Sequence, residues 1–380
     1  MSITPSHENE SRSAWQVFRK NRIAMAGVFF ILTMIFVAIV GPFIRPDHTA
    51  NANDQNLNIA REKPSLQVTQ LHLPKAVNSE SSILEKWTSY GWNNDYMWIP
   101  VGKYNLTEEG IEYWVFQGDS DLFDRPPERL SYEEIIPGKD DMSSAEKMAF
   151  VQSNSLVSKT YLLGTDRYGR DLLSRLMAGS VISLSVGFIA VLVSLLIGIT
   201  LGALAGYYGG RVDNLIMWLI NVIWSIPTLL LVLAIVFAFG KGFDKVFIAV
   251  GLTMWVEVAR VVRGQVLGVR ELQYIEAARA LGFSNARIIR KHILPNVINP
   301  VIVISAANFA TAILIEAGLS FLGIGAQIPV PSWGNMIKEH YSFITTDLAY
   351  LAILPGVMIM LLVLSFMLVG NGMRDALDVR

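Results

Sequence analysis

The sequence predicts an all-α polytopic membrane protein with six transmembrane helices and a mixed, β-rich external insertion between helices 1 and 2. Of its 380 residues, 52% are hydrophobic and 17% are charged, and the mean hydropathy of +0.41 is typical of a membrane protein. Six apolar runs approach the roughly 20 residues that cross about 30 Å of hydrocarbon. Residues 45–160, after the first run, carry 18 acidic and 11 basic residues, which indicates a separate body outside the membrane.

The six runs are the candidate transmembrane helices, and they differ in quality. They cover residues 23–44, 181–207, 214–239, 246–262, 297–321 and 348–369. The third is interrupted at Pro227, and the fourth is the weakest because it contains Glu257. The first has too long an apolar core for a signal peptide and lacks a small-residue cleavage pattern, so we expect it to be retained as a helix.

Lysine and arginine residues near the ends of these runs predict their orientation, because such residues concentrate on the cytoplasmic side. Four precede the first run: Arg12, Arg19, Lys20 and Arg22. Six lie between the fourth and fifth runs: Arg263, Arg270, Arg279, Arg287, Arg290 and Lys291. Both termini and the segment 263–296 are therefore expected in the cytoplasm. The chain then divides into a cytoplasmic tail (1–22), helix 1 (23–44), the external insertion (45–160) and a transmembrane domain (161–380).

The insertion predicts a small mixed domain and shows no catalytic constellation. Residues 93–121 combine aromatic and turn-forming residues and indicate short strands, whereas residues 140–153 indicate a helix. The chain has no cysteine, which excludes disulfides, thiolate metal sites and a cysteine nucleophile. In the motif GTDRYGRD that follows, Asp166 is expected to cap a helix that begins near Tyr168, in a structural role.

The segment YIEAARALGFSNARIIRKHILPN is unusual for a membrane protein because it predicts two short helices on the cytoplasmic side. Four apolar residues spaced by three indicate one apolar face of the first helix: Leu272, Ile275, Ala278 and Leu281. Gly282 can adopt a positive φ at the end of this helix, and Ser284 can cap the next one. Pro295 is expected to end the second helix.

The first helix is expected to dock into a groove of a partner protein. Ala277 and Ala278 make a flat surface beside Glu276 and Arg279, which suits a helix that seats in a groove. The predicted docking residues are Glu276, Ala277, Ala278, Arg279, Leu281, Gly282 and Pro295. A loop needed only for membrane topology would require positive charge but no pair of helices around a glycine, so we favour docking.

Two further groups of residues lie inside the apolar runs. Gly198, Gly202 and Gly206 share one helix face and predict close packing against another helix, although glycine is generally enriched in transmembrane helices. Polar residues are costly in the membrane, and the candidates for path residues or intramembrane contacts are Asn221, Ser225, Asn308, Thr311 and Glu316. Contacts between helices and contacts with a substrate are both open for them. Glu257 and Glu316 lie near predicted helix ends, where they could reach lipid headgroups.

The segment 274–296 resembles the EAA loop of ABC importer permeases. That pattern is E-A-A, three residues, Gly, about nine residues and then a hydrophobic residue before Leu-Pro, and six residues match it: Glu276, Ala277, Ala278, Gly282, Leu294 and Pro295. The stretches LGTDRYGRDLLSRLMAGSVISL, EAGLSFLGIG and PSWGNMI resemble the C-type permease subunit of dipeptide, oligopeptide and nickel importers. The insertion is longer than in the dipeptide members.

The resemblance implies a permease subunit of an ATP-driven importer in the bacterial inner membrane. Such a subunit forms half of the path for di- or oligopeptides by alternating access. Its implied partners are a second permease subunit, two ATPase subunits, an external binding protein and lipid, with no nucleic acid. The chain itself is expected to be non-catalytic and to bind no metal or cofactor, with ATP and Mg on the ATPase subunits.

Three alternatives have distinct sequence requirements. The same architecture could import nickel or another small solute. A secondary transporter acting alone would need charged groups at the membrane midplane or an inverted repeat, neither of which is evident. A membrane-anchored receptor or hydrolase would work through residues 45–160 and would not require an EAA loop.

Overall fold

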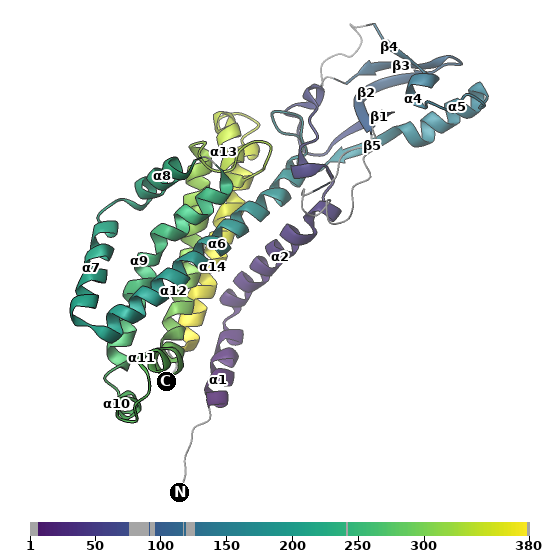
Figure 1. Cartoon of the computed structure of the whole chain (residues 1–380). Coiled ribbons are helices and arrows are strands. Elements are labelled where there is room, and N and C mark those ends of the chain that lie inside the picture. The colour runs from purple at the N-terminus through teal and green to yellow at the C-terminus, as the bar shows by residue number, and fades with distance from the viewer. Residues whose placement is uncertain are drawn as a thin grey trace.

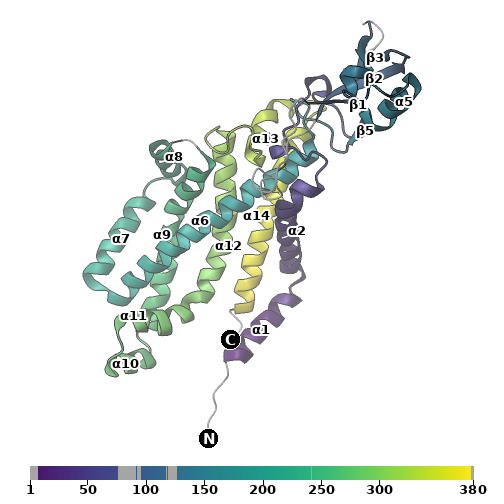
Figure 2. The same cartoon turned by 45° about the vertical axis from the view of Figure 1, so that its right-hand side comes forward.

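The computed structural model describes residues 7–75, 91, 96–116, 118, 126–240 and 242–377, with side chains from residue 14 onward. A bundle of long helices carries a five-stranded sheet at one end (Figure 1). The start of α1 and the end of α14, which are the first and last described parts of the chain, lie at the opposite end of the bundle, as do α10 and α11 (Figure 2). These helix ends and the basic segment therefore share one side, as the positions of the basic residues predicted.

Eight helices build the bundle. They are α1 (His7–Lys20), α2 (Arg22–Ile44), α6 (Leu172–Tyr208), α7 (Gly210–Trp224), α8 (Thr228–Phe239), α9 (Phe243–Val269), α12 (Leu294–Phe321) and α14 (Tyr350–Leu377). The short helices α10 (Gln273–Ala280) and α11 (Asn285–Ile288) lie at the end of the bundle opposite the sheet, and α13 (Trp333–His340) lies at the end near the sheet. Phe18 of α1 packs against Ala24 and Ala376, which holds the N-terminal helix against α14.

Four helices of the described chain are long and apolar enough to cross a membrane: α2, α6, the continuous helix 285–321 and α14. The pair α7 and α8 would make a fifth span, bent by 92° at the break around Pro227. The predicted fourth span corresponds to α9, which contains too many charged residues to qualify as a membrane span by composition. Any 18 consecutive residues of α9 include Glu257, Arg260 and either Lys245 or Arg263. Hydropathy alone therefore identifies four or five spans rather than six.

The contact between α6 and α9 is the most extensive between any two helices of the bundle, and three glycines lie in it. A Cβ on Gly198 would lie 2.5 Å from Val258 Cβ, one on Gly202 would lie 2.5 Å from the Ala259 carbonyl oxygen, and one on Gly206 would lie 2.7 Å from Val266 Cβ. The glycines thus face α9, where only a residue without a side chain allows the two backbones to approach so closely.

We expect Gly202→Val to separate α6 from α9, because the added side chain would overlap a backbone carbonyl that cannot rotate away. Overpacking of this kind typically costs 1–3 kcal/mol. The thermal midpoint of the purified chain in detergent should fall. Gly264→Val is the matched control, since its surroundings on α9 are open; equal midpoints for the two variants would contradict the packing role.

The insertion forms an antiparallel sheet in the order β4-β3-β2-β1-β5. Its strands are β1 (Leu66–Pro74), β2 (Tyr96–Leu106), β3 (Gly110–Val115), β4 (Glu128–Ser131) and β5 (Leu156–Tyr161). Two short helices, α4 (Tyr132–Ile135) and α5 (Ser144–Phe150), begin with capping boxes. The predicted strands and helix are therefore present, although residues 93–95, 117 and 119–121 of the prediction lie outside the described residues.

Candidate functional site

The turn between α10 and α11 has the geometry that its glycine predicted. The N–H of Gly282 donates to the Arg279 carbonyl (2.9 Å), and the N–H of Phe283 donates to the Ala278 carbonyl (3.1 Å). This is the hydrogen-bond pattern of a Schellman motif. Gly282 has a φ of +75°, a left-handed conformation that costs a residue with a Cβ roughly 1–2 kcal/mol. The chain therefore reverses direction sharply after α10.

One face of α10 is buried in an apolar cluster that three long helices share. Ile275 and Ala278 are buried in a cluster that α6, α9 and α12 supply: Ala203, Tyr207, Val258, Val262, Val266, Val297 and Val301. Leu272 and Leu281 are 46% and 74% exposed, so the predicted apolar face of four residues was wrong. Each residue turns a helix by about 100°, so a three-residue repeat shifts by about 60° per step, and the outer leucines leave the buried face.

The opposite face of α10 is exposed and carries four of the predicted docking residues, whereas Ala278, which was also predicted to dock, is buried against the bundle. Glu276, Ala277, Arg279 and Leu281 are exposed. The Glu276 carboxylate has no hydrogen-bond or ion-pair partner among the described residues, and the guanidinium of Arg279 lies 5.2 Å from the centre of the Tyr207 ring. The result is a short helix fixed to the bundle on one side, with small, acidic and apolar side chains free on the other.

The second short helix differs from its prediction in two respects. Ser284 occupies the N-cap position of α11, but its side chain makes no capping hydrogen bond. Pro295 does not end the helix: helical structure continues through a π turn, Ile289–Ile293, into α12, and Pro295 lies in the first turn of α12. Proline lacks an N–H, and the preceding π turn accommodates it because the regular hydrogen-bond ladder is already altered there. Arg290 and Lys291 of this turn are exposed.

Two of the predicted intramembrane polar residues are enclosed within the chain. Asn308 and Glu316 are each 1% exposed. Glu316 accepts a hydrogen bond from the Ser320 hydroxyl (2.6 Å), which in turn accepts one from the Ala326 N–H (3.3 Å). Glu316 therefore connects α12 to the loop that follows it. The expectation that this carboxylate reaches the lipid headgroups was wrong, because the α12–α13 loop covers it.

The other predicted polar residues are exposed beside the break between α7 and α8. Asn221 accepts a hydrogen bond from Arg260 (2.9 Å), whereas the Ser225 and Thr311 hydroxyls donate to carbonyls of their own helices, at 2.7 Å and 3.1 Å. Thr311 lines a hollow of about 290 Å³ between the break, α9 and α12, which we call the α9 hollow. Glu257 also lines it.

Glu257 lies far from its predicted position near a helix end. It was expected near a helix end, but α9 extends from Phe243 to Val269, which places Glu257 at the middle of the helix. The sequence does contain one indication of this position: Glu257 and Arg260 lie three residues apart in the least apolar of the six runs. Two opposite charges on one turn of a transmembrane helix indicate a polar environment on that face.

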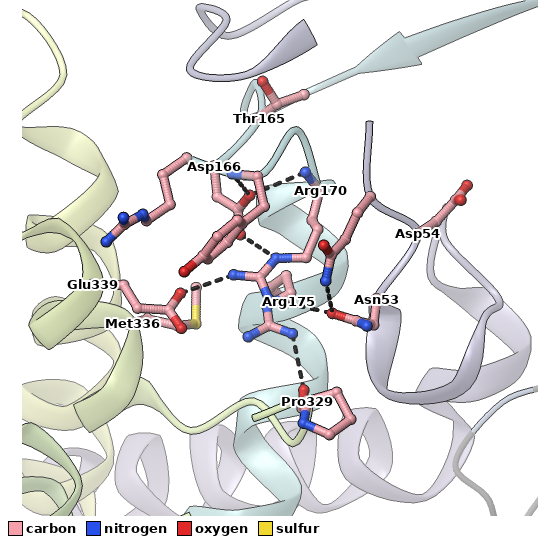
Figure 3. A network of polar contacts seen from close by, with 12 residues as sticks. Asn53, Asp54, Thr165, Asp166, Arg170, Arg175, Pro329, Met336 and Glu339 are labelled. Atoms are coloured by element: carbon pink, nitrogen blue, oxygen red, sulfur yellow. Dashed lines mark hydrogen bonds and ion pairs between the residues drawn. The ribbon is translucent and has the colours of Figure 1, made fainter. Parts of the chain in front are cut away.

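A second polar cluster, the outer network, joins the start of α6 to the insertion and to α13 (Figure 3). Arg170 is fully buried; its Nε donates to Asp166 (2.6 Å) and its Nη2 donates to Glu339 (2.8 Å). Its Nη1 also donates to Asn53 of the insertion (3.3 Å). On the next turn, Arg175 donates to the Pro329 carbonyl (3.2 Å). These contacts support the structural role predicted for the motif.

The same cluster shows that the residue predicted to cap α6 does not do so. Asp171, not Asp166, caps the helix, because its carboxylate accepts from the Ser174 N–H (2.8 Å). Asp166 instead accepts from the N–H groups of Tyr168 (2.8 Å) and Arg170 (3.0 Å). The sequence offered two aspartates five residues apart, and local pattern alone did not distinguish them.

The outer network also brings together three groups that could ligate a metal, Asp166, Glu339 and His340. The guanidinium of Arg170 already compensates both carboxylates. His340 Nδ1 lies 2.7 Å from the Met336 carbonyl, and burial lowers the pKa of this imidazole. Its Nδ1 therefore carries the proton, and its Nε2 accepts from the Arg167 N–H (3.4 Å). Each of the three groups therefore already has a partner within the described part of the chain.

Comparison with known families agrees with the motifs. Residues 198–380 match the model described as a binding-protein-dependent transport system inner membrane component. Residues 11–64 match the N-terminal transmembrane domain of oligopeptide transport permease C. The two matches include the basic segment and the first span.

Individual relatives are similar over much of the chain. A dipeptide transport system permease protein, DppC, from Alkalihalophilus pseudofirmus is 43% identical over 58% of this chain and 72% of its own length. The glutathione transport system permease protein GsiD from Pectobacterium atrosepticum is 42% identical over 58% of this chain and 73% of its own. DppC from Bacillus subtilis is 38% identical over 97% of this chain and 85% of its own.

Proposed function

Because the chain belongs to the OppC/DppC-type permeases of binding-protein-dependent ABC importers, we propose that it forms half of the path by which di- or oligopeptides cross the inner membrane. It is the non-catalytic transmembrane component, a multi-pass protein of the inner membrane. A second permease subunit supplies the other half of the path, two ATPase subunits bind ATP and Mg, and an external binding protein delivers the peptide.

The observation that carries the proposal is the two-sided character of α10. Its exposed face, with Glu276 and Ala277, is the docking surface for an ATPase subunit. Its buried face, with Ile275 and Ala278, lies in one apolar cluster with residues of α6, α9 and α12. A displacement of the docked ATPase is therefore passed to this shared cluster, which is what alternating access between two orientations of the path requires.

The membrane topology that fits this role has six crossings, with α7–α8 as the third and α9 as the fourth, and both termini in the cytoplasm. Charged groups in membrane spans face a bundle interior or an aqueous cavity, and non-helical backbone at membrane depth is found only in such places. Glu257, Arg260 and the break at Pro227 lie on one side of the chain. The second permease subunit covers this side, and the path runs between the two subunits.

Co-purification tests the docking surface. We expect Ala277→Trp to reduce recovery of the ATPase subunits with the tagged permease at least tenfold, because the bulky side chain prevents α10 from entering a groove. Ala277 is exposed, so the permease itself should fold and retain its second permease subunit. Thr345→Trp, an exposed position beyond the far end of the bundle, is the control. Equal recovery of the ATPase with both variants would contradict docking through α10.

A further inference from the structure

The α9 hollow combines an apolar lining with one carboxylate. Trp224 and Ile226 from the break between α7 and α8, Met254 from α9 and Ile315 from α12 give it apolar walls, and Glu257 contributes the charge. Its volume of about 290 Å³ is at the lower end of small-ligand sites, which suits one half of a site completed by a second subunit.

Glu257 carries a charge that nothing in the described part of the chain compensates. Its carboxylate has no hydrogen bond or ion pair there. The nearby cation, Arg260, is directed to α7 instead: its guanidinium stacks over the Trp224 ring at 3.4 Å and its Nη2 donates to Asn221 at 2.9 Å. Trp224 and Asn221 therefore hold the one candidate partner on α9 away from the carboxylate.

The position of Glu257 makes a missing partner costly. It is the fifteenth of the 27 residues of α9, and at 1.5 Å per residue it lies about 20 Å from either end of the helix. A glutamate side chain is too short to cover that distance to the headgroups. A charged side chain at the centre of the bilayer costs at least about 2.5 kcal/mol, so this carboxylate requires a cation or water beside it.

On the basis of the proposed function, we infer that Glu257 binds the protonated amino terminus of the peptide during its passage through the path. The relatives are named for dipeptides, oligopeptides and glutathione, all of which carry a primary ammonium group at neutral pH. An ammonium–carboxylate contact orients the peptide, and the apolar walls of the α9 hollow accept its side chains. The site is thus selective for the amino end and tolerant of sequence.

The test is uptake of radiolabelled Ala-Ala by the complete importer in proteoliposomes with saturating binding protein. We expect Glu257→Gln to slow uptake about tenfold, equivalent to about 1.4 kcal/mol, and Glu257→Asp to retain more of it. ATP hydrolysis with the loaded binding protein should stay within twofold of wild type, so that more ATP is spent per peptide. Asp244→Asn is the matched control, because it removes a carboxylate from the exposed start of the same helix.

Each other outcome overturns a distinct statement. If Glu257→Gln and Asp244→Asn transport equally well, Glu257 does not bind the amino terminus. If Glu257→Gln loses the second permease subunit on purification, the carboxylate pairs with a basic group of that subunit and the inference is wrong. If the wild-type importer takes up no Ala-Ala or longer peptide, the peptide assignment fails, and the inference fails with it.

Discussion

Gly282→Pro is expected to abolish ATP-driven uptake while leaving the permease bundle assembled. Proline fixes φ near −65°, whereas residue 282 has a φ of +75°, and proline also removes the N–H that donates to the Arg279 carbonyl. The turn cannot form in its present conformation, and the strain falls on the connection between α10 and α11. Because α10 then loses its fixed direction, we expect at least a tenfold loss of ATPase co-purification and of peptide uptake.

Two milder variants separate backbone conformation from steric effects. A Cβ on Gly282 would meet no atom within 4 Å, so Gly282→Ala tests the left-handed conformation by itself and should give an intermediate loss. Gly268→Ala, in the last turn of α9, also lies in open space but has no positive φ, and it should behave as wild type. Normal uptake by Gly282→Pro would refute the docking role of this turn.

Arg170→Met is expected to destabilise the outer end of the protein more than any other single change in the outer network. It would remove the only cation that donates to both Asp166 and Glu339 among the described residues, in a site where Arg170 is fully buried. Breaking a buried ion pair on one side typically costs 3–5 kcal/mol. For a protein of this size, the thermal midpoint in detergent should fall by about 10 °C.

The comparison for this variant is Arg129→Met. Arg129 pairs with Glu112 in the sheet, but its side chain is 77% exposed, and such surface pairs contribute about 0–1 kcal/mol. Its thermal midpoint should stay close to that of wild type. The triple variant Arg170→Met, Asp166→Asn and Glu339→Gln should recover part of the loss, because it removes the uncompensated charges. A midpoint for Arg170→Met equal to that of Arg129→Met would mean that the outer network contributes little.

Local sequence predicted a structural feature correctly wherever the residues of one segment are sufficient to cause that feature. The lengths of the apolar runs follow from the thickness of hydrocarbon, and they anticipated α2, α6, α12 and α14. The turn at Gly282 follows from the absence of a Cβ, and the Schellman hydrogen bonds require no other part of the chain. The motifs in these segments also identified the family.

Burial of individual polar and apolar residues could not be inferred in this way. Glu257 and Glu316 looked equivalent in the sequence, each a lone acid in an apolar run. The loop after α12 encloses Glu316, whereas the break between α7 and α8 leaves Glu257 open to the α9 hollow. Leu272 and Leu281 fitted an apolar repeat, but α10 is too short for its two ends to contact the same neighbours.

The sequence by itself determined the class of protein, the sidedness of its charges and the geometry of the α10–α11 turn, because hydropathy, basic residues and glycine conformation act within a few residues. Only the tertiary structure decided which face of α10 is free, that Arg260 is held away from Glu257, and that Arg170 joins the insertion to the bundle. These features depend on contacts between segments far apart in the chain, whose free energy exists only once the helices have packed.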